Sequence, residues 1–123
     1  MKKITYILLL NTVNCFSQPE IYSWLQNTET TGNYYIAGSP VLVPNNILVN
    51  CQKVQFSNDY VYVTATGVPS YPTGPFLDGN PSNAQNQAMI FKITRNPQQN
   101  LGDLTYTTAG NIGVFINGVA LFD

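Results

Sequence analysis

The chain has 123 residues, enough for one domain, and only 9% of them are charged, against roughly 25% in an average globular protein. Its polarity comes instead from Asn, Gln, Thr, Ser and Tyr, a composition typical of secreted β-rich proteins, which excludes a charged helical bundle and an acidic disordered tail. Without its first 17 residues the chain keeps three basic and six acidic residues, net −3, too few cations for the basic stripe that nucleic-acid binding requires.

The N-terminal segment reads as a signal peptide. Lys2 and Lys3 form a positive region, residues 4–10 form a short apolar run, and small side chains precede a predicted cleavage site near Ser17/Gln18. The apolar run is far shorter than the ~20 residues of a membrane-spanning helix. A buried N-terminal strand is the alternative, which the charged start disfavours. The sequence therefore predicts a secreted or periplasmic protein that is not integral to the membrane.

The first predicted elements follow the cleavage site. Residues 18–31 are rich in aromatic side chains and predict a strand or a short turn of helix, and residues 28–33 read as a polar connection. Residues 47–56 and 60–66 predict two strands joined by a hairpin at residues 57–59, because apolar and polar residues alternate along them. The two faces of the second strand are Val61, Val63 and Ala65 on one side and Tyr60, Tyr62, Thr64 and Thr66 on the other.

A long irregular segment runs from residue 67 to residue 86. Its four prolines exclude helix and interior strand. A connection this long in a small domain is functional, ordered by its own contacts, or a linker. Residues 89–94 then predict a third strand with its apolar side chains on one face, and residues 104–108 predict a further short strand.

A hairpin is predicted at the C-terminal end, over residues 110–123. Asn117-Gly118 between two apolar runs is a strong hairpin signal, because a type I′ turn needs positive φ at both central residues. An apolar hairpin needs a covering layer, so we expect a domain over residues 18–123 that is structurally incomplete at its C-terminus. The side chains that need cover are Val114, Ile116, Val119 and Leu121.

These elements together predict the fold class. We expect a mainly β protein with antiparallel sheets, arranged as a sandwich or a partly open barrel, with a long Pro/Gly-rich loop and a C-terminal hairpin. No apolar period of 3.6 residues persists for three turns, so a helical fold is excluded.

Cysteine usage leaves one thiol in the mature chain. Cys15 leaves with the signal peptide, so Cys51 remains alone. A lone cysteine in an exported protein indicates a buried thiol, an intermolecular bridge, or a partner outside the chain. A catalytic thiol is disfavoured because the chain contains no histidine to form the thiolate pair.

The Pro/Gly-rich loop carries the candidate ligand contacts. Tyr71 and Phe76 combine apolar area with a position in a loop, which suits a stacking surface for glycan or peptide. Asp78 and Asn80 present oxygen atoms at alternate positions, but the Gly and Glu of an EF-hand are missing, which favours an ordinary turn. Packing within the sheet is the competing role for the aromatic residues. The set comprises Trp24, Tyr34, Tyr35, Tyr60, Tyr62, Tyr71 and Phe76.

No catalytic constellation is recognisable in the sequence. Serine hydrolysis lacks a histidine base and a Gly-x-Ser-x-Gly turn, and zinc lacks its nitrogen and sulfur ligands. We therefore predict no catalytic residues, no metal site and no cofactor for this chain.

Several motifs in the second half of the chain resemble the N-terminal half of the YHYH domain family of exported proteins. Their order and spacing match over roughly half the chain, and the Ile-Gly-Val-x-x-Asn-Gly-Val element is the most specific part. The motifs lie at residues 67–69, 72–76, 80–81, 85–87, 91–97 and 110–119.

The resemblance also carries two departures. Tyr71 stands where similar proteins often have a histidine, and the His-rich segment that names the family is absent from this chain. The resemblance implies a truncated YHYH domain of unknown biochemical function, with a disulfide partner for Cys51 outside the chain. Two alternatives stay open: a glycan- or peptide-binding β module, and part of an enzyme or metal-binding protein whose histidines lie in a missing C-terminal region.

Overall fold

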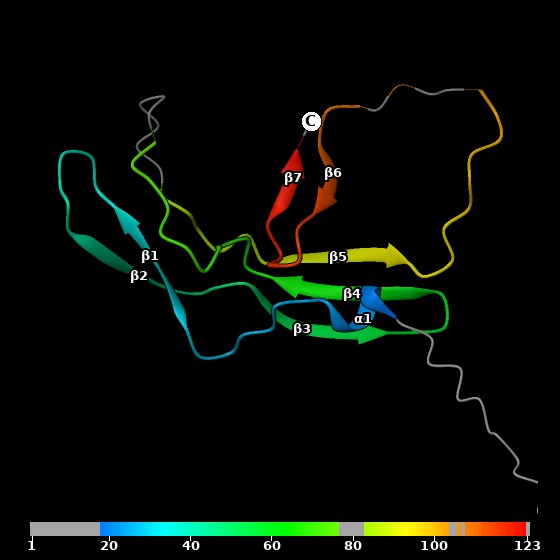
Figure 1. Ribbon diagram of the computed structural model, residues 1–123, viewed down its shortest axis with the longest axis horizontal. Helices are drawn as coiled ribbons and strands as arrows, with labels where there is room; N and C mark the ends of the chain where they lie inside the picture. The colour runs from blue at the N-terminus through cyan, green and yellow to red at the C-terminus, as the bar shows by residue number, and fades with distance from the viewer. Residues whose placement is uncertain (1–17, 77–82, 104–105, 107, 123) are drawn as a thin grey trace, which may run out of the picture.

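The computed structural model describes residues 18–76, 83–103, 106 and 108–122, which form one short helix and seven strands. The strands pair as three antiparallel sheets, β1–β2, β3–β4–β5 and β6–β7 (Figure 1). The predicted mainly β, antiparallel fold is confirmed, and within the described residues the sheets do not close into a barrel. The elements are α1 (Pro19–Tyr22), β1 (Thr31–Tyr35), β2 (Leu42–Leu48), β3 (Cys51–Phe56), β4 (Tyr60–Ala65), β5 (Met89–Thr94), β6 (Asn111–Val114) and β7 (Ala120–Phe122).

The central sheet is β3–β4–β5, and the sequence predicted its strands well. β4 pairs with β3 through Val54 and Val63, and with β5 through Tyr60 and Thr94. The predicted β3–β4 hairpin is confirmed. Its turn is held by the Ser57 hydroxyl, which accepts hydrogen bonds from the backbone N–H groups of Asp59 and Tyr60 at 3.3 and 3.1 Å. These local pairings succeed as predictions because alternation and turn chemistry act over few residues.

The core lies on the inner face of the central sheet. Val61, Val63 and Ala65 of β4 are buried there, as the alternation predicted, and Ile21 of α1 packs against them. In Figure 1 α1 lies in front of β3 and β4, where it covers this face. The helix occupies the segment for which strand and helix were both open. The partly buried side chains around this core are Trp24, Val54, Phe91 and Ile93.

The β1–β2 hairpin extends beyond one end of the central sheet (Figure 1). Residues 28–33 are not a connection throughout, because β1 begins at Thr31. The single strand expected over residues 47–56 is also wrong in its bounds: it is divided between the end of β2, which runs from Leu42 to Leu48, and β3, which begins at Cys51. Neither β1 nor β2 shows a clean alternation of apolar and polar residues in its sequence, and β2 contains Pro44. Their extended conformation comes from tertiary pairing, which sequence periodicity does not report.

Part of the Pro/Gly-rich loop runs beside β1. The Tyr35 N–H donates to the Thr73 carbonyl at 2.9 Å, and the Thr73 N–H donates to the Asn33 carbonyl at 3.1 Å. Around Thr73 the segment is therefore ordered by contacts that it makes with β1, which is one of the three roles left open for it. The predicted strand at residues 104–108 falls largely outside the described residues.

The C-terminal hairpin β6–β7 is confirmed, but its turn differs from the prediction. The Gly118 N–H donates to the Phe115 carbonyl at 2.8 Å, and the Phe115 N–H donates to the Val119 carbonyl at 2.9 Å. Gly118 has φ +76°, whereas Asn117 keeps a negative φ, so the loop is a three-residue one rather than type I′. Of the four apolar side chains expected to need cover, Val114 and Val119 are half-buried and the other two, Ile116 and Leu121, are exposed.

Candidate functional site

The outer face of the central sheet lies opposite the core. Because successive side chains of a strand alternate between faces, it receives the residues that are not on the inner face. Tyr62 and Thr64 are half-buried and the others are exposed. We define the outer face by Lys53, Gln55, Tyr60, Tyr62, Thr64, Ile90, Lys92 and Thr94.

Tyr60, Tyr62 and Thr64 form a row along β4 on this face. Their side chains are two residues apart, so the row spans about 13 Å. The two tyrosine rings are 6.3 Å apart between centroids and tilted by 54°. The Lys92 ammonium lies 3.9 Å from the Tyr60 ring centroid, in cation–π geometry. One end of the row is therefore an aromatic pair with a cation held against it.

A groove of about 420 Å³ opens at the other end of the row, where Thr64 forms part of its wall. This volume is within the range of small-molecule binding sites. The groove combines three side-chain amides and two hydroxyls with aliphatic groups, and its lining contains no charged residue. We call it the end groove, and it is lined by Asn46, Ile47, Leu48, Gln52, Thr64, Ala65, Thr66, Asn86 and Ala88.

Several polar groups of the end groove are fixed by hydrogen bonds to the backbone. Gln52 Nε2 donates to the carbonyls of Val49 and Asn50 at 3.1 and 3.0 Å, which leaves its Oε1 as an acceptor. Asn86 Oδ1 accepts from the Ala88 N–H at 2.8 Å, which leaves its Nδ2 as a donor. These side chains are held before any ligand arrives, which lowers the entropy lost on binding.

Two residues of the end groove adopt a left-handed backbone conformation. Asn46 has φ +56° and Ala88 has φ +47°. Asn tolerates this conformation, but Ala pays a steric cost of about 1–2 kcal/mol because its Cβ approaches the following carbonyl. Backbone strain of this kind is concentrated at functional sites. It therefore marks the end groove as a candidate for function.

A second, smaller hollow of about 260 Å³ adjoins the end groove through their shared residue Gln52. Its wall includes Asn27, whose Oδ1 accepts from the N–H groups of Glu29 and Thr30 at 3.3 and 2.9 Å. Asn27 Nδ2 donates in turn to the Val49 carbonyl at 2.9 Å. Both ends of this amide are bonded within the protein, so the Asn27 side chain holds the turn at residues 27–30.

The ligand contacts expected from the sequence lie elsewhere. Tyr71 and Phe76 are 60% and 44% exposed, and neither lines the end groove. Asp78 and Asn80 lie outside the described residues. The sequence did place Tyr60 and Tyr62 on the polar face of their strand. Sequence patterns do not reveal the end groove, because the walls of the groove come from four separate segments that only single Asn, Gln and Thr residues mark.

Cys51 lies in the core rather than at the surface. Its side chain is fully buried, and its Sγ lies 3.6 Å from the Ile116 carbonyl, to which the thiol donates. Burial raises the pKa of the Cys51 thiol from 9.0 to about 11. Among the roles left open for this cysteine, the structure shows the buried thiol, and Gly118 of the hairpin turn packs beside it.

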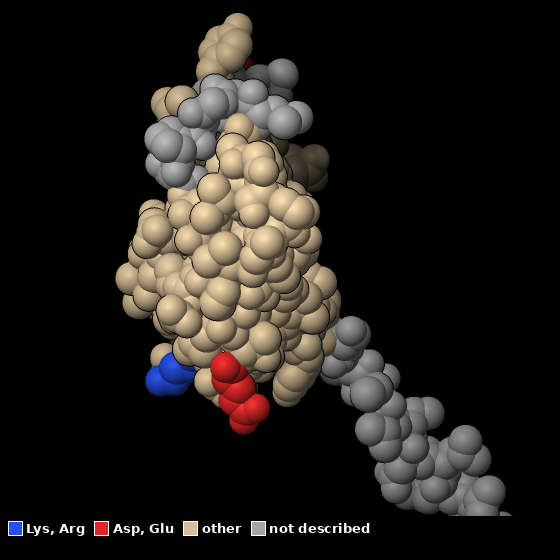
Figure 2. Space-filling view, turned by 90° about the vertical axis from the view of Figure 1, so that its left-hand side faces the viewer, with Lys and Arg blue, Asp and Glu red and all other residues tan. Residues whose placement is uncertain are grey.

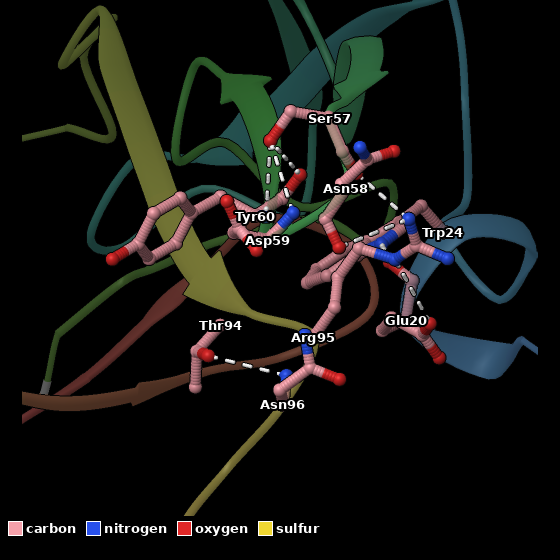
Figure 3. A network of polar contacts seen from close by, with 9 residues as sticks. All are labelled: Glu20, Trp24, Ser57, Asn58, Asp59, Tyr60, Thr94, Arg95 and Asn96. Atoms are coloured by element: carbon pink, nitrogen blue, oxygen red, sulfur yellow. Dashed lines mark hydrogen bonds and ion pairs between the residues drawn. The ribbon is translucent and has the colours of Figure 1, made fainter.

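A polar network at the far end of the sheet is structural (Figure 3). Arg95 Nη1 donates to the Ser57 carbonyl at 2.7 Å, and Arg95 Nε lies 3.5 Å from Glu20 Oε1. Trp24 Nε1 donates to the Glu20 carbonyl at 2.7 Å. The network joins α1, the β3–β4 turn and the end of β5.

Charged groups are few over much of the surface. Figure 2 shows the face at the β1–β2 end of the molecule, where uncharged side chains dominate and charged ones are confined to the lower edge. Within the described residues, no group of three His, Cys, Asp or Glu side chains is placed to hold a metal ion. In the part of the chain that the structure describes, no helix is long and apolar enough to cross a bilayer.

Comparisons with protein-family models, with curated protein sequences and with solved structures found no match for this chain. The geometry of the outer face and of the end groove therefore carries the functional argument.

Proposed function

We propose that this chain is an exported binding module that holds a carbohydrate along the outer face of β4, with one end of the ligand in the end groove. The observation that carries the proposal is the continuity of the two features at Thr64. This residue belongs to the groove wall and continues the row of Tyr62 and Tyr60. An extended ligand would contact both.

The chemistry of the site favours sugar over other ligands. A sugar ring has apolar C–H faces that stack on aromatic rings, and a rim of hydroxyls that both donate and accept. The tyrosine row supplies the rings. The end groove supplies the Gln52 acceptor, the Asn86 donor and aliphatic walls without charge.

Export and family relationship belong to the same proposal. Lys2-Lys3 and the apolar run after them support export, with cleavage near Ser17/Gln18. The ordered motifs between residues 67 and 119 support a relationship to the YHYH domain family. A carbohydrate-binding role is compatible with both and requires no histidine.

The test is a glycan array probed with the purified full chain, followed by titration calorimetry with the glycan that binds best. Tyr62→Ala removes a stacking ring, and Thr64→Val removes a hydroxyl while it keeps the side-chain shape. Tyr62→Ala is expected to weaken binding at least tenfold, because aromatic anchors dominate such contacts. The matched control is the double variant Tyr71→Ala/Phe76→Ala, which is expected to bind as the parent does.

Three results would contradict the proposal. The array could show no glycan bound, or the chain could bind a peptide library instead. Loss of binding in Tyr71→Ala/Phe76→Ala with full binding in Tyr62→Ala would move the site to the Pro/Gly-rich loop. Circular dichroism of each variant checks that the fold is retained.

A further inference from the structure

The lysines of the described residues lie together on one face of the molecule. Lys53 on β3 and Lys92 on β5 both belong to the outer face, and they flank the tyrosine row from opposite sides. From the spacing of strands and residues in a sheet, their Cα atoms are about 12 Å apart. Arg95, the third cation of these residues, is engaged with Glu20 and the Ser57 carbonyl.

No carboxylate side chain stands at the outward strand positions of the same face. The outward positions of β3, β4 and β5 contain no Asp or Glu. Asp59 lies in the turn between β3 and β4, and Glu20 lies on α1, which covers the opposite face. The outer face is therefore positive on a chain whose net charge is negative.

The Lys92 ammonium is also held in place. It lies 3.9 Å from the Tyr60 ring centroid, and Lys92 itself pairs with Tyr62 across the β4–β5 ladder. The ring occupies one side of the ammonium, while the exposed side chain leaves the other side to solvent. A carboxylate can accept a charge-assisted hydrogen bond there without breaking the cation–π contact.

From these placements we infer that the outer face selects carbohydrates that bear carboxylates, with uronate groups bound by Lys53 and Lys92. This inference rests on the proposed carbohydrate-binding function. Two separated cations match a ligand with few, spaced negative charges. A densely charged polyanion needs many more cations for tight binding, and the net negative chain would repel it.

The experiment compares acidic glycans with neutral counterparts of the same linkage. Immobilised hyaluronate and unsulfated chondroitin, which carry carboxylates only on alternate sugars, are each paired with their carboxyl-reduced forms and probed with the full chain. We expect at least one acidic polymer to bind about tenfold more tightly than its reduced form, since a hydrogen bond to a charged group contributes about that factor. The difference is expected to shrink as salt is raised.

Variants of the two lysines test whether the outer face causes the preference for acidic polymers. Lys53→Gln and Lys92→Gln are each expected to weaken binding of the acidic polymer about threefold, because the two lysines share the tenfold preference, and to leave binding of the reduced polymer unchanged. The matched controls Lys53→Arg and Lys92→Arg keep the charge and are expected to retain most of the selectivity.

The outcomes separate the two proposals. Equal binding of acidic and reduced polymers, or acid selectivity that both Gln variants retain, would overturn the uronate inference and leave carbohydrate binding intact. Binding of no polymer of either kind, together with no binding on the glycan array, would overturn both. Thermal unfolding of each variant shows whether a loss of binding reflects a loss of structure.

Discussion

At the scale of single residues, the Cys51 thiol makes the free energy of unfolding depend on pH. Burial raises the pKa of its thiol from 9.0 to about 11, because the thiolate would lose its hydration in the core. Well below pH 9 the thiol is protonated in both the folded and the unfolded chain. Between pH 9 and pH 11 the unfolded chain releases its proton first, so the free energy of unfolding falls by about 2 kcal/mol as the pH rises.

The measurement is urea unfolding of the parent and of Cys51→Ala at pH 8 to pH 11. The variant still contains the tyrosines and lysines, so subtracting its pH dependence isolates the thiol. The parent should lose more stability than the variant over this range. Parallel pH profiles would show that the Cys51 thiol ionises equally well in both states.

Gly118 is the second residue with a specific requirement. Its φ is +76°, and a Cβ built there would overlap the Cβ of Ala65 and lie 3.0 Å from Cys51 Sγ. Gly118→Ala is therefore expected to destabilise the protein by about 3 kcal/mol, through backbone strain and an overpacked core together. The readout is the free energy of unfolding from urea titration.

Gly38 provides the control for this substitution. Its φ is +78°, nearly the same, but no atom lies within 4 Å of the position that a Cβ would occupy. Gly38→Ala should thus cost only the strain of the left-handed conformation, about 1 kcal/mol. If the two variants lose the same stability, the hairpin turn does not pack against Cys51 and Ala65 as described.

At the scale of elements, Arg95 joins three of them. It donates to the Ser57 carbonyl in the β3–β4 turn and lies beside Glu20 of α1 (Figure 3). Arg95→Ala is expected to lower the free energy of unfolding by about 1–2 kcal/mol, because a charged donor to the backbone is lost. Glu20→Gln should cost less than about 1 kcal/mol, since partly exposed ion pairs contribute little. An equal loss in both variants would mean that the ion pair dominates the junction.

The central sheet could be predicted from the sequence, and the β1–β2 hairpin could not. In β4 the alternation of Val61 and Val63 with Tyr60 and Tyr62 decides which face is buried, and the turn that Ser57 caps is local. β2 contains Pro44 and the left-handed Asn46, so no periodicity marks it. Its strand conformation depends on pairing with β1, which a local pattern cannot express.

At the scale of the whole molecule, the candidate site could likewise be predicted only in part, because local sequence patterns do not report how distant segments pair. Alternation alone put Tyr60 and Tyr62 on an exposed face. The placement of Lys53 and Lys92 beside them required the register of three strands. The end groove required β2 and the segment before β5 to meet at the end of β4, and a single asparagine such as Asn86 gives no sequence signal for that meeting.

The proposed export makes a prediction for the whole chain. Every element of the described fold lies C-terminal to the predicted cleavage site, since α1 begins at Pro19. The Gln18 carbonyl accepts the first backbone hydrogen bonds of α1, from Ile21 and Tyr22 at 3.0 and 3.2 Å, so cleavage before Gln18 keeps them. Expression of the full chain in a bacterium with a general secretory pathway should therefore release a folded product that starts at Gln18. Intact mass and N-terminal peptide mapping of the exported fraction test this, and the glutamine is expected to have cyclised in part with loss of ammonia.

Substitution of Lys2 and Lys3 by Glu should retain the protein in the cytoplasm, because the positive region directs insertion. An exported product that still carries residues 1–17 would contradict the cleavage, and a cytoplasmic parent would contradict export itself.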